Sequence, residues 1–198
     1  SDRSEPLGEV SVEVKEFLPD QMKISSRFSS EAGLGWVKPE ALTAVIQVDT
    51  LFGTPAQDRR VTANVQFSPT VPSFERFPGF SFFDPTHNQQ GFSDTLEEQT
   101  SDATGKAEFA LGLEKYSAGT FYLTVSSEAF EAGSGRSVTS YVQTLVSTAD
   151  SLIGLKSTDS LSYISKDALR NIEVVAVDAT GNAVAQSGLR VVIEEKKY

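Results

Sequence analysis

Apolar and polar residues alternate along most of this chain, and no stretch keeps the 3.6-residue period of an amphipathic helix. The alternation is regular in residues 10–14, 22–28, 42–48 and 61–67, which are separated by residues that favour turns. A period of two places apolar side chains on one face of a β-strand and polar side chains on the other. The chain is therefore predicted to form half-buried strands with little or no α-helix.

About seven strand candidates occur between Leu18 and Val146, at short and fairly even spacing. Turns that contain glycine separate several of them, including residues 102–105 and 117–119. Short strands at such spacing are typical of an antiparallel β-sandwich of the immunoglobulin-like type. We therefore predict an all-β fold whose first module is such a sandwich.

A second and shorter group of strand candidates follows residues 147–151, which are predicted to form a corner. These candidates lie at residues 152–155, 160–164, 172–177 and 189–194. Roughly four strands are too few to close a sandwich, so the second module is expected to be truncated, with its open edge covered by the first module, covered by another chain, or frayed. The tetrapeptide Asp-Ala-Thr-Gly occurs at 102–105 and again at 178–181, which shared turn chemistry and module duplication explain equally well.

Two corners that contain proline frame the first part of the chain. Pro19 cannot donate to a sheet ladder and biases Leu18 away from the helical region, so the chain is expected to turn there. Gly53 is expected to adopt positive φ in a tight turn on which strand register depends. The structural motif residues predicted from the two corners are Phe17, Leu18, Pro19, Asp20, Phe52, Gly53, Pro55 and Ala56.

Residues 68–92 combine prolines with six phenylalanines. The prolines argue against a central strand, and the rings are too apolar to stay in solvent. We expect a long loop with one short strand near residues 79–83, its rings packed over an open end of the sandwich; the alternative is an exposed aromatic patch for a partner. Trp36 is expected to plug the edge of the core, with an exposed contact role as the alternative.

The chain carries 17 basic and 27 acidic residues, which gives a formal net charge of −10. This charge argues against nucleic acid and anionic membrane surfaces as partners, because both require a positive patch. The sequence has no cysteine, so it can form no disulfide, thiolate nucleophile or thiolate metal site. No apolar run approaches the ~20 residues of a membrane span, and the first residues have no signal-peptide character. We expect the chain to be a fragment of a longer protein.

Residues that could support catalysis are few. His87 is the single histidine of the sequence, and its polar loop favours a solvated surface role. Glu97 and Glu98 are adjacent, so on a strand they would point to opposite faces, and a distant glycosidase-type pair has no support in the sequence. The Asp-Ala-Thr-Gly segments lack the alternating oxygen ligands and closing glutamate of a calcium loop. We therefore predict no enzyme activity, no catalytic residue, no cofactor and no metal.

The two corners resemble those of the macroglobulin-like domains of the bacterial alpha-2-macroglobulin family. An acidic strand ends in Phe-Leu-Pro-Asp at 17–20, and a later apolar strand ends in Leu-Phe-Gly-Thr-Pro-Ala at 51–56. The resemblance continues through residues 78–82, 102–105 and 187–191 and covers most of the chain. It implies tandem macroglobulin-like (immunoglobulin- or fibronectin-III-like) sandwiches, with residues 1–11 as a linker or the end of a preceding module, 12–147 as the first sandwich and 148–198 as a partial second one.

The resemblance also implies a function, as a structural piece of a broad-range endopeptidase inhibitor that scaffolds a bait region and has a role in host defence. In this family a protease cuts the bait, the molecule rearranges, and in many members a Cys-Gly-Glu-Gln thioester captures the protease. The segment Leu96-Glu97-Glu98-Gln99 is not that motif, because it lacks the cysteine. The implied partners are proteases, met through the full-length parent, and neighbouring macroglobulin-like domains of the same chain. The implied location is the periplasm, with the parent exported and held by a lipid anchor at the inner membrane.

The same strand pattern permits a different class of function. A tandem pair of immunoglobulin-like domains in a bacterial surface protein, used for adhesion or ligand binding, is the alternative to the protease trap. An all-β hydrolase is a third hypothesis, which the sequence does not favour because it shows no convergent polar residues.

Overall fold

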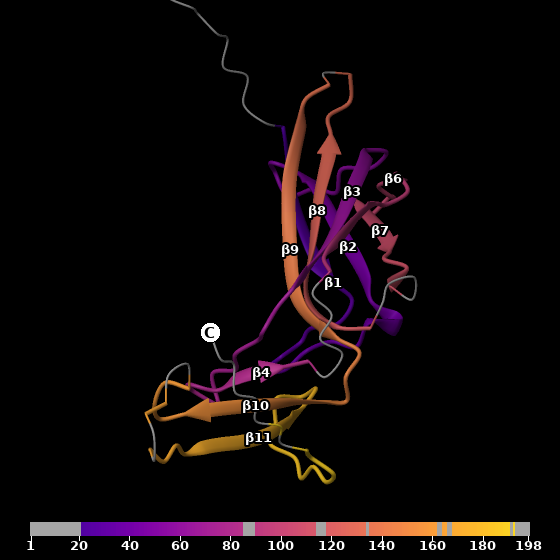
Figure 1. Cartoon of the computed structure of the whole chain (residues 1–198). Helices are drawn as coiled ribbons and strands as arrows, with labels where there is room; N and C mark the ends of the chain where they lie inside the picture. Colours follow the sequence, from indigo (N-terminus) through magenta and orange to yellow (C-terminus); the bar gives the residue numbers. More distant parts are fainter. Residues whose placement is uncertain are drawn as a thin grey trace, which may run out of the picture.

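The computed structural model describes residues 21–84, 90–113, 118–133, 135–161, 164–165, 168–190 and 192. These residues form antiparallel β-sheets, and Figure 1 shows an elongated unit of two facing sheets with a smaller sheet at one end, whose strands run across the long direction of the first. The predicted all-β, antiparallel fold class is confirmed. We call the elongated part the larger unit and the sheet at its end the smaller unit.

The described part of the chain contains eleven strands and one short 3-10 helix. The strands are β1 (Met22–Phe28), β2 (Thr43–Thr50), β3 (Arg60–Pro69), β4 (Ser81–Phe83), β5 (Phe92–Thr95), β6 (Gln99–Thr100), β7 (Lys106–Ala110), β8 (Thr120–Phe130), β9 (Ser137–Ser147), β10 (Ser151–Ser157) and β11 (Ile172–Asp178). The 3-10 helix η1 (Pro39–Ala41) has proline in its first turn, where the missing N–H costs no hydrogen bond.

The larger unit is a sandwich of two sheets. One sheet has the order β1-β2-β7, and the other has the order β5-β3-β8-β9 with β6 beside β3. The predicted alternation is clear in β3, where every second residue from Val61 to Phe67 is buried and the residues between them are more exposed. Ile46 of β2 and Phe109 of β7 meet them from the facing sheet in one core. Burial of each such side chain contributes about 1.5–3 kcal/mol, so this core is the main source of stability of the larger unit.

The smaller unit is a three-stranded sheet of order β11-β10-β4. Its strands β10 and β11 form the antiparallel pair predicted from residues 152–155 and 172–177. The strands predicted at residues 160–164 and 189–194 are wrong at the positions described, which lie outside any strand. An alternating sequence shows which side chains are apolar, but a strand forms only where a neighbouring strand offers hydrogen bonds.

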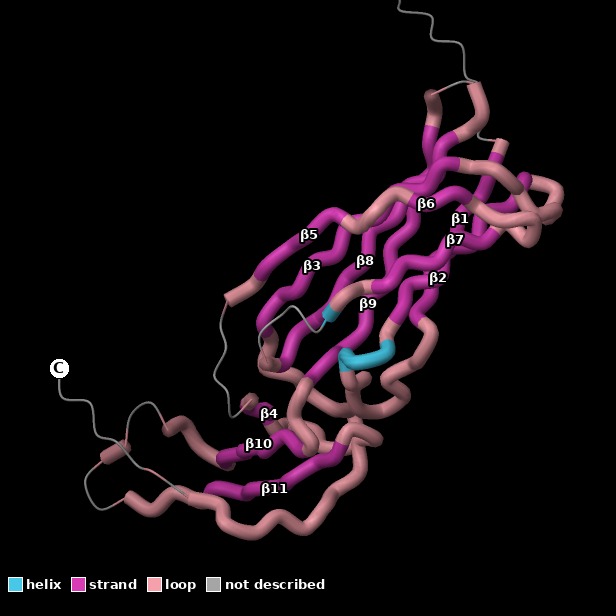
Figure 2. The backbone as a smooth tube through the Cα atoms, turned by 90° about the vertical axis from the view of Figure 1, so that its right-hand side faces the viewer, coloured by secondary structure: helices cyan, strands magenta, loops and turns pink. Residues whose placement is uncertain are grey.

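The segment rich in proline and phenylalanine packs Phe74 and Phe82 against side chains of the larger unit, but it also belongs to the smaller unit, which the sequence did not indicate. The short strand expected near residues 79–83 is present as β4, but it pairs with β10 of the smaller unit. Phe92 begins β5, a strand that the sequence pattern did not indicate, and β5 pairs with β3. Figure 2 shows how the chain leaves the larger unit after β3, runs beside β10 as β4 and returns as β5.

Candidate functional site

The two units meet around a buried group of side chains that we call the junction cluster, namely Trp36, Phe74, Phe82, Leu145, Leu152 and Val177. The side chain of Trp36 is buried, and its indole Nε1 donates to the Ala149 carbonyl at 3.2 Å. The rings of Trp36 and Phe74 lie 6.0 Å apart, and Phe74 meets Phe82 edge-on at 4.7 Å. Aromatic contacts of this kind add about 0.5–1.5 kcal/mol beyond area burial. Trp36 therefore plugs a core, as expected, and that core lies between the units.

Both Asp-Ala-Thr-Gly segments form the same turn. In each, the aspartate Oδ1 accepts from the threonine N–H, the threonine hydroxyl and the N–H four residues on, at 2.7 to 3.0 Å. The turn at Asp102 closes on its own unit, where the Val48 N–H donates to the Gly105 carbonyl at 2.8 Å. The turn at Asp178 closes on the other unit, where the Trp36 N–H donates to the Ala179 carbonyl at 3.0 Å. The repeated tetrapeptide is thus a docking turn in both places.

Glycine permits the close backbone approach at this second turn. A Cβ added to Gly35 would lie 2.1 Å from the Ala179 carbonyl oxygen, and a Cβ added to Gly181 would lie 2.5 Å from the Leu34 carbonyl oxygen. Both distances are shorter than real Cβ contacts, so any other residue would force the backbones apart. Gly181 also has φ of 79°, which glycine adopts without strain.

Hydrogen bonds lower the pKa of both turn aspartates. The Thr180 hydroxyl, followed by the Asn182 N–H, holds the pKa of Asp178 below its ordinary value of 3.8. The N–H of the residue four places on is the largest cause of the lowered pKa of Asp102, followed by the hydroxyl of the threonine within that turn. A carboxyl whose pKa is lower in the folded state stabilises the fold above its unfolded pKa, and this contribution is lost as the pH falls through the lowered value.

Replacing Asp178 with alanine should therefore lower the urea midpoint at neutral pH, and the difference from the unmodified chain should narrow as the pH falls through the carboxyl range. Asp102→Ala is the matched variant in the larger unit and should show the same pH dependence, because its turn has the same hydrogen bonds. Urea denaturation at several acidic pH values measures both. A difference that does not change with pH would show that carboxylate ionisation does not contribute.

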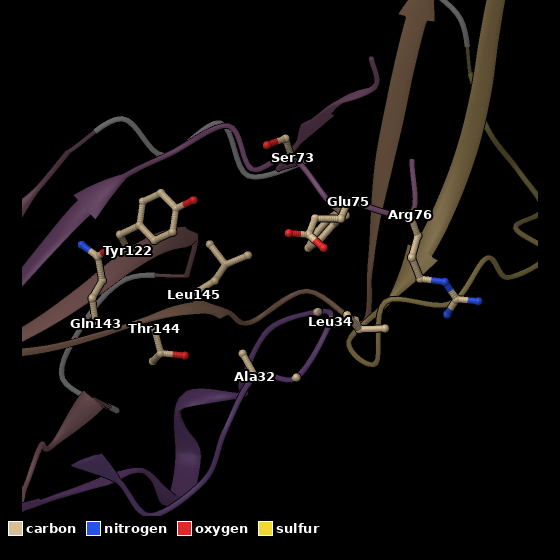
Figure 3. Close-up of a pocket in the computed structure, with 12 residues that line it drawn as sticks. Ala32, Leu34, Ser73, Glu75, Arg76, Tyr122, Gln143, Thr144 and Leu145 are labelled. Atoms are coloured by element: carbon tan, nitrogen blue, oxygen red, sulfur yellow. The ribbon is translucent and has the colours of Figure 1, made fainter. Parts of the chain in front are cut away.

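A cleft of about 420 Å³ opens beside the junction cluster. Figure 3 shows Tyr122 and Thr144 of the larger unit on one side of it and Leu34 and Arg76 on the other. The Arg76 Nη1 donates to the Asn182 Oδ1 at 2.5 Å, which ties this wall of the cleft to the docking turn of the smaller unit. The shape of the cleft therefore depends on how the two units meet.

The cleft offers little chemistry. Among the described residues that line it, Glu75 is the one carboxylate, and none is a histidine or a cysteine that could act as general base or thiolate nucleophile. In the part of the chain that the structure describes, no group of three His, Cys, Asp or Glu side chains could hold a metal ion. No helix within the same residues is long and apolar enough to cross a membrane.

The residues predicted for the two corners fall into two groups. Phe17, Leu18, Pro19 and Asp20 lie outside the described residues, as does His87. The second corner follows β2, and none of its residues belongs to the junction cluster. There, Gly53 has φ of 85° and donates its N–H to the Thr50 carbonyl at 3.0 Å, Phe52 is 97% exposed, Pro55 bridges to Asp49, and Ala56 is buried.

The adjacent glutamates Glu97 and Glu98 form no paired site in the structure. Glu98 instead accepts from Arg60 at 3.2 Å in an exposed ion pair. Sequence reasoning missed the junction, although two signals for it were present. These are Trp36 directly after Gly-Leu-Gly and the second copy of a turn whose first copy docks on a neighbouring strand.

Comparison with known sequences gives consistent matches. The family model described as "Bacterial Alpha-2-macroglobulin MG5 domain" matches residues 29–147. The chain is 47% identical over 192 residues to an alpha-2-macroglobulin homolog of Yersinia pestis, and 34% identical over 195 residues to the alpha-2-macroglobulin of Pasteurella multocida. Each alignment covers 97% of this chain and 10% of the relative, so the chain spans about one tenth of the length of these relatives.

Solved structures share the fold. A trypsin-activated alpha-2-macroglobulin from Escherichia coli matches with a TM-score of 0.57 and 22% identity, over 83% of this chain and 12% of that one. A Salmonella alpha-2-macroglobulin reacted with methylamine matches with a TM-score of 0.59 and 19% identity, over 85% of this chain and 12% of that one. The family match ends at Ser147, the last residue of β9, and so contains most of the larger unit. The chain therefore belongs to the bacterial alpha-2-macroglobulin family, through an MG5 domain at residues 29–147.

Proposed function

We propose that this chain is a structural segment of a bacterial alpha-2-macroglobulin-like inhibitor that traps endopeptidases of broad range. The observation that carries the proposal is the match of residues 29–147 to the MG5 domain of that family. Among the similar solved structures are Escherichia coli alpha-2-macroglobulin activated by trypsin and by porcine elastase. These proteases differ in their specificity pockets, which supports a broad protease range for the parent of this chain.

The role proposed for this segment is to hold the bait region in place. The segment has no cysteine, so if the parent has a thioester, that thioester lies in another part of the parent. The parent is proposed to act in the periplasm, exported and anchored by lipid at the inner membrane, where its acidic surface would favour solubility.

The smaller unit supports a two-module organisation, with residues 12–147 in the first module and 148–198 in part of a second. One face of its sheet packs on the junction cluster. The opposite face carries Phe83, Leu155 and Val174, which are exposed by 43%, 41% and 46%. In a sandwich, a second sheet covers such an apolar face. We propose that other residues of the parent cover it, and that neighbouring macroglobulin-like domains are the direct partners of this segment.

The test mixes the full-length parent with several unrelated proteases and follows the cleavage of a large protein and of a small peptide. A trap restricts access to the bound protease without blocking its active site, so protein cleavage should fall while peptide cleavage continues. The segment alone should neither hydrolyse the substrates nor inhibit the proteases. The matched control is a parent without its bait region, which should not inhibit.

Two results would contradict the proposal in different ways. Absence of inhibition by the full-length parent would favour the adhesion hypothesis. Potent inhibition by the segment alone would show that it carries a reactive loop, for which residues 131–136 and 72–83 are the candidates.

A further inference from the structure

The strand β4 belongs to one unit by sequence and to the other by pairing. It lies between β3 and β5, which pair with each other in the larger unit. Its own partner is β10 of the smaller unit, with Phe82 opposite Gly154 and Phe83 opposite Ile153. The whole of β4 falls inside the span that matches the MG5 domain. The larger unit therefore contributes a strand to its neighbour's sheet.

The junction cluster is likewise built from both units. Phe82 comes from within the MG5 match, whereas Leu152 and Val177 come from β10 and β11, and all three side chains are fully buried. Trp36 and Leu145 bury further apolar surface in the same place. Separating the units would expose this surface to water, which the hydrophobic effect opposes. The smaller sheet thus has a core only while it is docked.

Three glycines provide the space that this contact needs. A Cβ on Gly154 would lie 2.6 Å from the buried ring of Phe82. A Cβ on Gly35 or on Gly181 would collide with a backbone carbonyl of the opposite unit, as described above. By contrast, a Cβ on Gly188 would meet nothing within 4 Å. Gly35 and Gly181 face each other across one backbone contact, and Gly154 makes a second contact with Phe82, so close fit at two separate points fixes how the units sit against each other.

Residues 148–150 connect the larger unit to the smaller unit, and polar contacts hold the chain in place at this connection. The Thr120 hydroxyl donates to the Asp84 Oδ2 at 2.6 Å and lies 2.8 Å from the Ser147 Oγ. Thr120 and Ser147 are buried, so the bond between them is shielded from water. Lys38 donates to Asp150 at the surface. The residue that follows β4 and the start of the connection are therefore held to the same point of the larger unit.

We infer that the two units, as formed by the described residues, fold and unfold as one cooperative unit, in which β4 of the MG5 domain is the docking strand for the module that follows. Domains joined by a short linker ordinarily move separately unless their interface is extensive and apolar. Here the interface shares a strand, a core and a fitted backbone contact. The end of the family match at residue 147 is therefore not a boundary of folding. This inference does not depend on protease trapping.

The test compares Gly181→Ala with Gly188→Ala in the complete chain. The two glycines have φ of 79° and 75°, so both substitutions carry the same backbone strain, and only Gly181 contacts the other unit. Urea unfolding is followed by far-UV circular dichroism, which reports mainly the larger unit, and by emission of Trp36, the single tryptophan, which reports the junction. In the unmodified chain the two transitions should coincide.

Gly181→Ala should move both transitions together to lower urea. The ratio of folded to unfolded chain should fall roughly 5- to 150-fold below that of Gly188→Ala, as expected for overpacking. A shift of the Trp36 transition alone would overturn the inference, as would equal behaviour of the two variants. If Gly181→Ala does not fold, urea unfolding of the unmodified chain still tests the inference. Separate transitions by circular dichroism and by Trp36 emission would show that the units fold independently.

Discussion

Replacing Phe82 with alanine is expected to lower the free energy of unfolding of the whole chain by about 3–5 kcal/mol, the cost of removing a buried aromatic side chain. Phe82 is fully buried and packs edge-on against Phe74 at 4.7 Å and against Phe77 at 6.0 Å. The backbone of Gly154 lies directly beneath its ring, so the site has little freedom to collapse. This loss is a large part of the stability of an ordinary domain, so the variant should be close to unfolding at 25 °C.

The matched control for this substitution is Phe83→Ala. Phe83 is the next residue of β4 and has the same ring, but it points to the opposite face of the sheet and is 43% exposed. Its replacement should therefore cost much less. Urea midpoints of both variants, with Trp36 emission and circular dichroism as probes, measure the difference. Equal midpoints for the two variants would show that Phe82 does not hold the junction.

Replacing Glu131 with alanine is expected to cost about 1.5–3 kcal/mol, the range for a hydrogen bond to a charged group. Glu131 is 8% exposed, accepts from the Gln21 N–H at 2.8 Å through Oε1, and accepts from Arg136 at 2.6 Å through Oε2. Its removal takes this carboxylate away from a guanidinium and from a backbone N–H, and the carboxylate itself is the buried member of the pair. Denaturation midpoints at neutral pH measure the loss.

The control for this pair is Glu98→Ala. Glu98 also accepts from an arginine, Arg60, but both side chains are about half exposed. Exposed ion pairs contribute roughly 0–1 kcal/mol, so this variant should stay near the stability of the unmodified chain. If Glu98→Ala lowers the free energy of unfolding as much as Glu131→Ala does, burial does not explain the stabilising effect of the Glu131 pair.

The strands β3, β7 and β8 of the larger unit could be predicted from the sequence because each of them buries one face. In β3, the apolar residues at every second position from Val61 to Phe67 follow the period of two without interruption, and the structure places them in the core. The strand β5 lacked this signal, since its pattern of Ser93, Asp94 and Thr95 is polar on both faces. It forms because β3 offers it an edge, which a local pattern cannot show.

The junction could not be predicted for a related reason. The sequence favours burial of Trp36 and Phe82 but does not show against which partner, because that depends on contacts between residues far apart in the chain. The glycine at 154 has no local role as a turn or a cap. Glycine is needed there because the ring of Phe82, seventy-two positions earlier in the sequence, leaves no room for a Cβ. Only the assembled fold brings the two residues together.

Native-state hydrogen exchange of the unmodified chain tests most directly whether the MG5 domain and the sheet that follows it are one unit. The measurement compares the slowest amides of β8, in the centre of the larger sheet, with those of β10, in the centre of the smaller one. If the units are joined through β4 and the junction cluster, both sets should exchange through the same global opening, with the same free energy and the same response to added urea. Exchange of β10 through an opening of much lower free energy, while β8 stays protected, would contradict this.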